Sequence, residues 1–171
     1  ELTVLCEPSI ELVELIDGNE LDLAIITDCG SSRASEVFRR ERLLWVTSNR
    51  HSTHLEEPLP LALGRTSCGW RRAAIECLES IGRPHHIAYT SANASAVASA
   101  VLSGLAISIF PESGLRPGMR VLSPADGFPE LPPCRVGLIR NPHESSALAD
   151  ALAEHIISSL DNLSEAAQAA E

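Results

Sequence analysis

The stretch ASAVASAVLSGLAISIFP, residues 94–111, decides the fold class of this chain. Its first half is an alanine-rich amphipathic pattern that predicts a helix, and Gly104 stands where a helix ends in the left-handed conformation. The apolar run at residues 105–110 then predicts a buried parallel strand that Pro111 stops. A helix that passes into a strand with almost no loop is the return half of a βαβ unit. We therefore expect an α/β protein.

The same order of elements recurs near the start of the chain. Residues 12–16 predict a helix, residues 17–19 a turn and residues 21–27 a strand. Two such units in 171 residues predict two Rossmann-like lobes with parallel sheets, joined by two crossovers. Ligands of such folds bind outside the carboxyl ends of the strands. We therefore expect a cleft between the lobes, lined by strand ends and helix N-termini.

The composition limits the class of protein. The formal net charge is −10, and an acidic surface disfavours direct binding of nucleic acid because phosphate groups need a basic patch. The sequence holds no apolar run long enough to span a membrane. Its five cysteines include no CxxC pair, which is typical of the reducing cytoplasm. We expect a cytoplasmic protein that has no membrane partner, no metal and no cofactor.

Periodicity and turn residues predict the remaining elements. Strands are expected at residues 2–6, 43–47, 61–63, 86–89, 119–122 and 134–140, helices at 9–16, 68–80, 92–103 and 145–160, and a polar loop at 28–36. Lobe I is expected to hold residues 1–50 with 141–171, and lobe II residues 51–140, with crossovers near 48–58 and 124–141. Because the chain opens inside an expected strand, we expect the first strand and helix of lobe I to be missing.

Three segments share their pattern with one known family. Residues 18–25, GNELDLAI, are similar to its G-E-L-D-L-A-I strand entry, with Asn19 as an extra residue. Residues 41–46, ERLLWV, resemble its crossing strand, and residues 100–107, AVLSGLAI, resemble its A-V-x-A-G-L-G-I joint with Ser103 in place of Ala. On these residues the chain resembles the effector-binding domain of LysR-type transcriptional regulators over almost its whole length.

This resemblance implies a periplasmic-binding-protein type II-like fold and a protein that is not an enzyme. It implies that a small molecule, often an organic acid, closes the cleft and changes how a homo-oligomer sits on DNA. The winged helix-turn-helix that would contact DNA is absent from these residues, so we expect no operator binding by this chain alone. Members form dimers or tetramers, and residues 2–5 are a candidate edge strand for pairing.

Candidate effector-binding residues lie where helices begin after strands. The free N–H groups and the positive end of the helix dipole favour an anion there, and hydroxyl groups add donors. The candidates are Ser9, Thr27, Asp28, Arg65, Thr66, Ser67, Cys68, Trp70, Thr90 and Ser91. The resemblance implies effector contacts for the loops that hold Ser9, Ser67, Thr90 and Ser91. Arg65 is a candidate for bidentate binding of a carboxylate.

Each candidate also has a plainer interpretation. The hydroxyl side chains of Ser9, Ser67 and Thr90 are ordinary helix N-caps on their own. A solvated loop accounts for Thr27 and Asp28, a surface position for Arg65, and simple packing for Trp70.

Cys68 and Cys77 offer a thiol-based redox sensor as an alternative function. Cys68 is expected at a helix N-terminus, where the dipole lowers the pKa of a thiol. The pair also resembles the cysteine spacing in the peroxide-sensing branch of the family. On an intact helix nine residues rise about 13.5 Å, so a disulfide would require the helix to unfold. The plainer interpretation is that Cys77 is a small buried apolar residue.

Two further functions remain as alternatives. A stand-alone solute-binding protein of a transport system shares the two-lobe architecture, but it would need an export signal or lipid anchor upstream. An α/β enzyme has little support, because we find no GxSxG, no glycine-rich phosphate loop, no HExxH and no nucleophile–base set.

Overall fold

The computed structural model describes residues 2–27, 36–143 and 146–162. The chain divides into two compact units: unit 1 is Glu1–Arg40 with Cys134–Glu171, and unit 2 is Glu41–Pro133. The first division therefore comes before the expected crossover near 48–58. The reason is that residues 43–48 pair with strands of unit 2 and not of unit 1.

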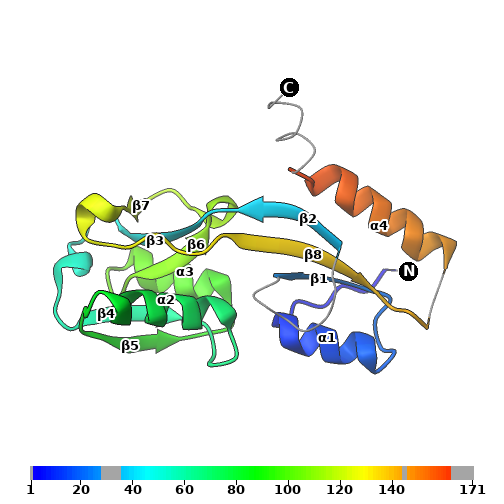
Figure 1. Cartoon of the computed structure of the whole chain (residues 1–171), viewed down its shortest axis with the longest axis horizontal. Helices are drawn as coiled ribbons and strands as arrows, with labels where there is room; N and C mark the ends of the chain where they lie inside the picture. The colour runs from blue at the N-terminus through cyan, green and yellow to red at the C-terminus, as the bar shows by residue number, and fades with distance from the viewer. Residues whose placement is uncertain (1, 28–35, 144–145, 163–171) are drawn as a thin grey trace. The chain divides into compact units, whose positions relative to one another are not determined.

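Unit 1 is a three-stranded sheet with one helix on each face (Figure 1). Its elements are α1 (Ser9–Asp17), β1 (Leu23–Thr27), β2 (Glu36–Glu41), β8 (Cys134–Arg140) and α4 (Ala147–Leu160). The strand order is β1-β8-β2. β1 and β8 run antiparallel, so the expectation of a parallel sheet is wrong for this pair.

Alternation along β8 explains the two helix-covered faces of unit 1. Ile139 belongs to the cluster of α1, with Ile16 and Ile26. The preceding Leu138 belongs to the cluster of α4, with Ala153. Successive side chains of a strand point to opposite faces, so one strand supplies both hydrophobic layers.

One expectation for unit 1 is wrong, and one strand was not expected. Residues 2–6 form no strand, and Leu2 and Val4 are 69% and 72% exposed. These residues pair with no strand of the described chain, and an extended segment without a partner has no ladder of hydrogen bonds. Strand β2 was not expected, because its charged residues hide its alternation. This strand begins at Glu36, the last residue of the expected polar loop, and the rest of that loop, residues 28–35, lies outside the described residues. Asp28 and Cys29 lie outside the described residues.

Unit 2 holds the βαβ elements that the sequence predicts. Its elements are β3 (Leu43–Ser48), η1 (Thr53–Leu55), β4 (Leu59–Leu63), α2 (Gly69–Ser80), β5 (His85–Thr90), α3 (Ala94–Leu102), β6 (Ser108–Pro111), η2 (Glu112–Gly114), β7 (Met119–Leu122) and η3 (Pro124–Asp126). β4 and β5 are parallel, and a parallel bridge joins Leu61 to Ile107. β3 runs antiparallel to both β6 and β7, so the parallel expectation fails for these strands.

Gly104 ends α3 as predicted. Its φ is +78°, and its N–H donates to Val101 O at 3.0 Å. A Cβ at this position would lie 2.5 Å from Cγ of His51, so the segment after β3 packs directly on the glycine. Strand β6 begins at Ser108, three residues later than the expected strand at 105–110, and Leu105 is half exposed.

The core of unit 2 is aliphatic and lies in two layers. Leu61 and Leu63 of β4 pack with Ala74 and Leu78 of α2. Ala62 belongs to the other layer, which α3 covers with a run of small side chains. Alternating residues of β4 thus face different helices. Within the described residues, no helix has both the length and the apolar character of a membrane span.

Candidate functional site

Strands β4 and β5 end side by side, and the loops after them form the candidate site of unit 2. Leu63 is the register partner of Thr90, and Ser91 N donates to Leu63 O at 3.1 Å. Loops 64–68 and 91–93 therefore start at the same sheet edge and lead into α2 and α3. This is the carboxyl end of parallel strands, where ligands of α/β folds bind.

Arg71, in the first turn of α2, connects the two strand ends. Its Nη1 donates to Gly64 O at 3.0 Å and to Thr90 Oγ1 at 3.5 Å. Thr90 is exposed, and Arg71 is half-buried. Sequence reasoning missed Arg71, because the Arg71-Arg72 pair has the pattern of a solvated helix face. Its position in the sequence could have indicated this role, because a residue in the first turn of a helix lies beside the end of the strand that precedes the helix.

The start of α2 differs from the expectation. Cys68 is the N-cap residue, without a side-chain cap, and Thr66 and Ser67 are exposed loop residues. A Cβ on Gly64 would lie 3.0 Å from Cβ of Cys68, so the loop folds back tightly on itself. Ser67 is therefore not a cap, and the first N–H groups of this helix have no partner within it. Arg65 is exposed in the same loop.

The start of α3 also differs from the expectation. The cap is Asn93, whose Oδ1 accepts from Ser95 N at 2.8 Å and from Ala96 N at 3.3 Å. Ser91 supports this cap, because its Oγ accepts from Asn93 N at 3.1 Å. Thr90 and Ser91 therefore do not cap the helix. The hydroxyl of Thr90 contacts Arg71 instead.

Trp70 packs against the core of unit 2 at the start of α2. Its Nε1 is buried and has no hydrogen-bond partner among the described residues. The structure thus supports the packing interpretation of this side chain.

The candidate residues of unit 1 form a pair of their own. Ser9 Oγ lies 3.2 Å from Thr27 Oγ1 and accepts from Thr27 N, also at 3.2 Å. Ser9 is the first residue of α1 and not its cap, since Pro8 holds that position. The start of α1 and the end of β1 are therefore joined by the two hydroxyl residues that the sequence singled out.

The geometry of the two cysteines disfavours the redox alternative. α2 is continuous from Gly69 to Ser80, with Cys68 before its first turn and Cys77 near its end. Burial raises the pKa of the Cys77 thiol, and Glu76 raises it further. Since the thiolate is the reactive form, this shift disfavours oxidation of Cys77.

Comparison with known proteins decides the family. The family model described as LysR substrate binding domain matches residues 1–161. The chain belongs to this family. The HTH-type transcriptional regulator PecT of Dickeya dadantii (strain 3937) is 29% identical to it over 151 residues, which are 88% of this chain and 48% of PecT. The chain spans about half the length of the curated relatives it matches.

Solved structures of LysR regulatory domains share the fold. The CcmR regulatory domain of Synechocystis PCC6803, in complex with 2-PG, has a TM-score of 0.69 at 15% identity, covering 95% of this chain and 85% of that one. The effector-binding domain of QuiR, in complex with shikimate, has a TM-score of 0.66 at 14% identity, covering 90% and 78%. This LysR domain therefore has the expected periplasmic-binding-protein type II-like fold.

Proposed function

We propose that this chain is the small-molecule-sensing domain of a cytoplasmic LysR-type transcriptional regulator. An effector bound to it changes how a homo-oligomer sits on DNA, which a separate N-terminal domain contacts. The domain itself catalyses no reaction. Family membership and regulator relatives support this assignment over a transport protein.

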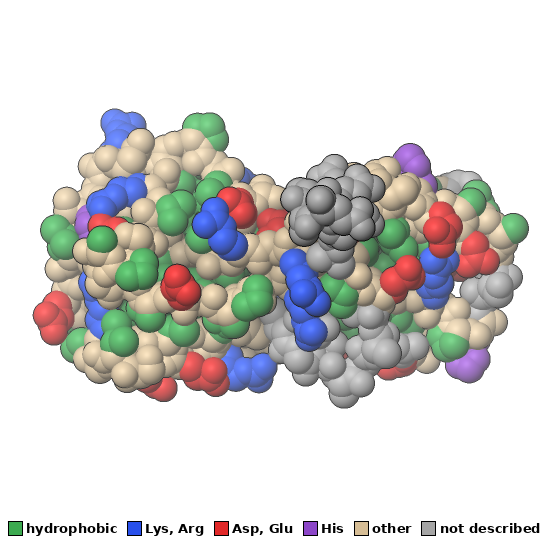
Figure 2. All heavy atoms as spheres, turned by 45° about the horizontal axis from the view of Figure 1, so that its top comes forward, with side chains coloured by type: hydrophobic (Ala, Val, Ile, Leu, Met, Phe, Trp, Pro, Cys, Tyr) green, Lys and Arg blue, Asp and Glu red, His purple; other side chains and the backbone are tan. Residues whose placement is uncertain are grey.

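The charge distribution is consistent with DNA contact through another domain. The net charge of the chain is −10. On the face drawn in Figure 2, the described Arg side chains lie apart from one another, interspersed with acidic and apolar ones. Such a surface lacks the electrostatic footprint of a nucleic-acid-binding face.

The observation that carries the proposal is the junction of Arg71 with Gly64 and Thr90. It places a guanidinium and an exposed hydroxyl at the carboxyl end of two parallel strands, next to the N-terminus of α2. A guanidinium binds carboxylates in a bidentate geometry, and a helix N-terminus favours negative charge. We infer that the effector is a small organic acid.

The proposed contacts extend to the residues around this junction in unit 2. In unit 2 the loop residues Arg65, Thr66, Ser67, Cys68 and Ser91 flank the junction, and Trp70 lies in the first turn of α2 next to Arg71 in sequence. In unit 1, Ser9 and Thr27 remain proposed effector-binding residues of that unit by itself, where they are joined directly, and Asp28 lies outside the described residues. The CcmR and QuiR domains, solved in complex with 2-PG and with shikimate, support a small-molecule effector for this chain.

The proposal is tested by thermal unfolding of the chain with a panel of small mono- and dicarboxylic acids. An acid present at a hundredfold excess over its Kd stabilises the folded state by about 2.7 kcal/mol. We expect at least one acid to raise Tm, and Arg71→Gln and Thr90→Val each to reduce that rise. Arg50→Gln, an exposed cation of the same unit, is the matched control and should keep the full rise. An undiminished rise in both site variants would reject this site.

A further inference from the structure

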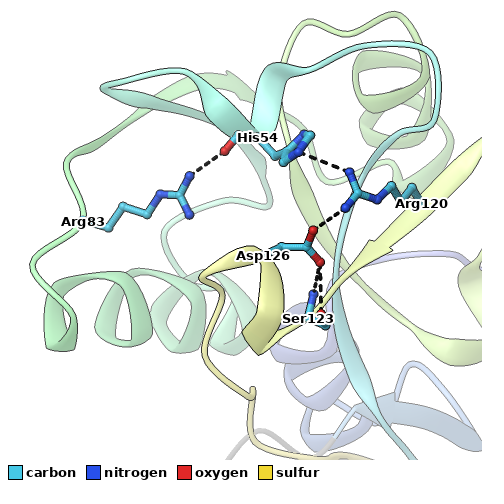
Figure 3. Close-up of polar contacts among 5 residues, drawn as sticks. All are labelled: His54, Arg83, Arg120, Ser123 and Asp126. Carbon is cyan, nitrogen blue, oxygen red and sulfur yellow. Dashed lines mark hydrogen bonds and ion pairs between the residues drawn. The ribbon is translucent and has the colours of Figure 1, made fainter.

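His54 is a buried histidine at the centre of a polar cluster in unit 2. It lies in turn η1 and is only 8% exposed. Its Nε2 is 3.2 Å from Nη1 of Arg120 on β7 (Figure 3). Arg120 in turn pairs with Asp126 of η3. One imidazole thus connects three segments that are separate in sequence.

The contact with Arg120 fixes the protonation state of the ring. A guanidinium donates hydrogen bonds and accepts none, so Nε2 of His54 must be the acceptor. The single ring proton then resides on Nδ1, which is buried and has no partner among the described residues. An imidazolium would carry a second N–H, directed at the guanidinium of Arg120. The contact therefore exists only while His54 is neutral.

The other charged groups around His54 make a second proton still less favourable. Arg83 donates through Nη2 to His54 O at 2.5 Å, and its guanidinium lies 4.2 Å from the ring centre of Phe128. Among the described residues, Asp126 is the carboxylate whose charge acts on the ring, and it already accepts from Ser123 N at 2.9 Å. Strands β3 and β4, which also contact η1, hold no titratable side chain.

These surroundings lower the pKa of His54 below its usual value. The largest cause is burial, followed by the positive charge of Arg120, and Arg83 acts in the same direction. The negative charge of Asp126 opposes them but does not prevail.

We propose that His54 makes unit 2 sensitive to pH through its contact with Arg120. With His54 neutral, the contact holds η1 against β7 and, through the Arg120–Asp126 pair, against η3. Protonation of the ring breaks the contact and releases η1. This device is independent of the effector proposed above.

The sign of the pH dependence follows from linkage. In the unfolded chain His54 titrates near its usual pKa of 6.5, and in the folded chain its pKa is lower. Between these two values the unfolded state binds more protons, so stability is complete above 6.5 and decreases as the pH falls through this window. One proton changes the unfolding constant by at most about tenfold per pH unit. Asp126 and Glu112, whose pKa values are lowered from 3.8 and 4.5, titrate below the window.

The experiment combines NMR titration of the histidine rings with amide hydrogen exchange on the full chain, between about pH 7.5 and about pH 5.5. We expect His54 to titrate below 6.5. The amides of Leu55 and Glu56 donate to Ser52 O and Thr53 O in this turn, and their protection, corrected for the intrinsic rate, should fall up to about tenfold per pH unit. The amides of α3 serve as the internal reference and should lose less protection.

A pair of variants separates His54 from the other histidines. His54→Gln keeps an acceptor near the position of Nε2 but does not titrate, so protection of η1 should become independent of pH. His86→Gln, at an exposed position on β5, should behave as wild type. A His54 pKa at or above 6.5, or the same loss of protection in His54→Gln, would overturn the proposal. The titration of His54 in the wild-type chain tests the proposal by itself, so the test stands even where His54→Gln fails to fold.

Discussion

At position 104, both the backbone conformation that ends α3 and the packing of the neighbouring segment require a residue without a side chain. Its φ of +78° disfavours any side chain, and the ring of His51 occupies the space of a Cβ. Thr53 Oγ1 also donates to its carbonyl at 2.9 Å. The helix-to-strand joint therefore holds the segment after β3 in place as well as ending α3.

We predict that Gly104→Ala destabilises the chain more than Gly82→Ala. Both glycines have positive φ, which costs an alanine about 1–2 kcal/mol. Only Gly104 adds a steric conflict, since a Cβ at Gly82 meets nothing within 4 Å. Urea unfolding followed by tryptophan fluorescence measures the difference. Equal losses of unfolding free energy would mean that His51 moves aside freely.

At the residue scale, the sequence predicted backbone conformation better than it predicted which side chains lie at the candidate site. A glycine between a helical and a strand-like run has few possible roles, so the sequence was sufficient for Gly104. Arg71 and Asn93 were missed because their roles depend on which side chain reaches the neighbouring loop. Propensity ranks Ser, Thr and Asn almost equally as caps, and only the register of β4 with β5 selects among them.

At the scale of elements, the caps of α2 and α3 distinguish the structure from the sequence expectation. Asn93 satisfies two backbone donors, whereas Ser67 makes no side-chain cap. We predict that Asn93→Ala lowers the free energy of unfolding by about 1 kcal/mol. Ser67→Ala, the matched control, should stay within about 0.5 kcal/mol of wild type. Chemical denaturation of the three proteins checks this, and a larger loss for Ser67→Ala would contradict the cap assignment.

Strand direction was the main error at this scale. The apolar runs at β3, β6 and β8 predict burial on both faces, and such burial is typical of parallel strands. Central antiparallel strands covered by helices on both faces have the same composition. Whether two strands pair parallel or antiparallel depends on how the chain between them connects their ends. Hydrophobic periodicity carries no information on that connection. The parallel pair β4 and β5 was predictable because only a helix and short loops connect them.

At the scale of the whole molecule, the order of elements and the three family-like segments were sufficient to predict the fold. The division into units was not predictable to the residue, since an apolar strand such as β3 suits either lobe. Within the described residues, each unit has two hydrophobic clusters of its own. The residues proposed to bind the effector are attached to these cores at the ends of strands.

The central claim is that a small organic acid binds where β4 and β5 end. Amide chemical-shift mapping tests it most directly, with an acid that raises Tm titrated into the isotope-labelled chain. The account predicts that the largest shift changes fall on residues 64–71 and 90–95, and that Arg71→Gln greatly reduces them. Shift changes confined to α4 and β8, with these two loops unaffected, would contradict it.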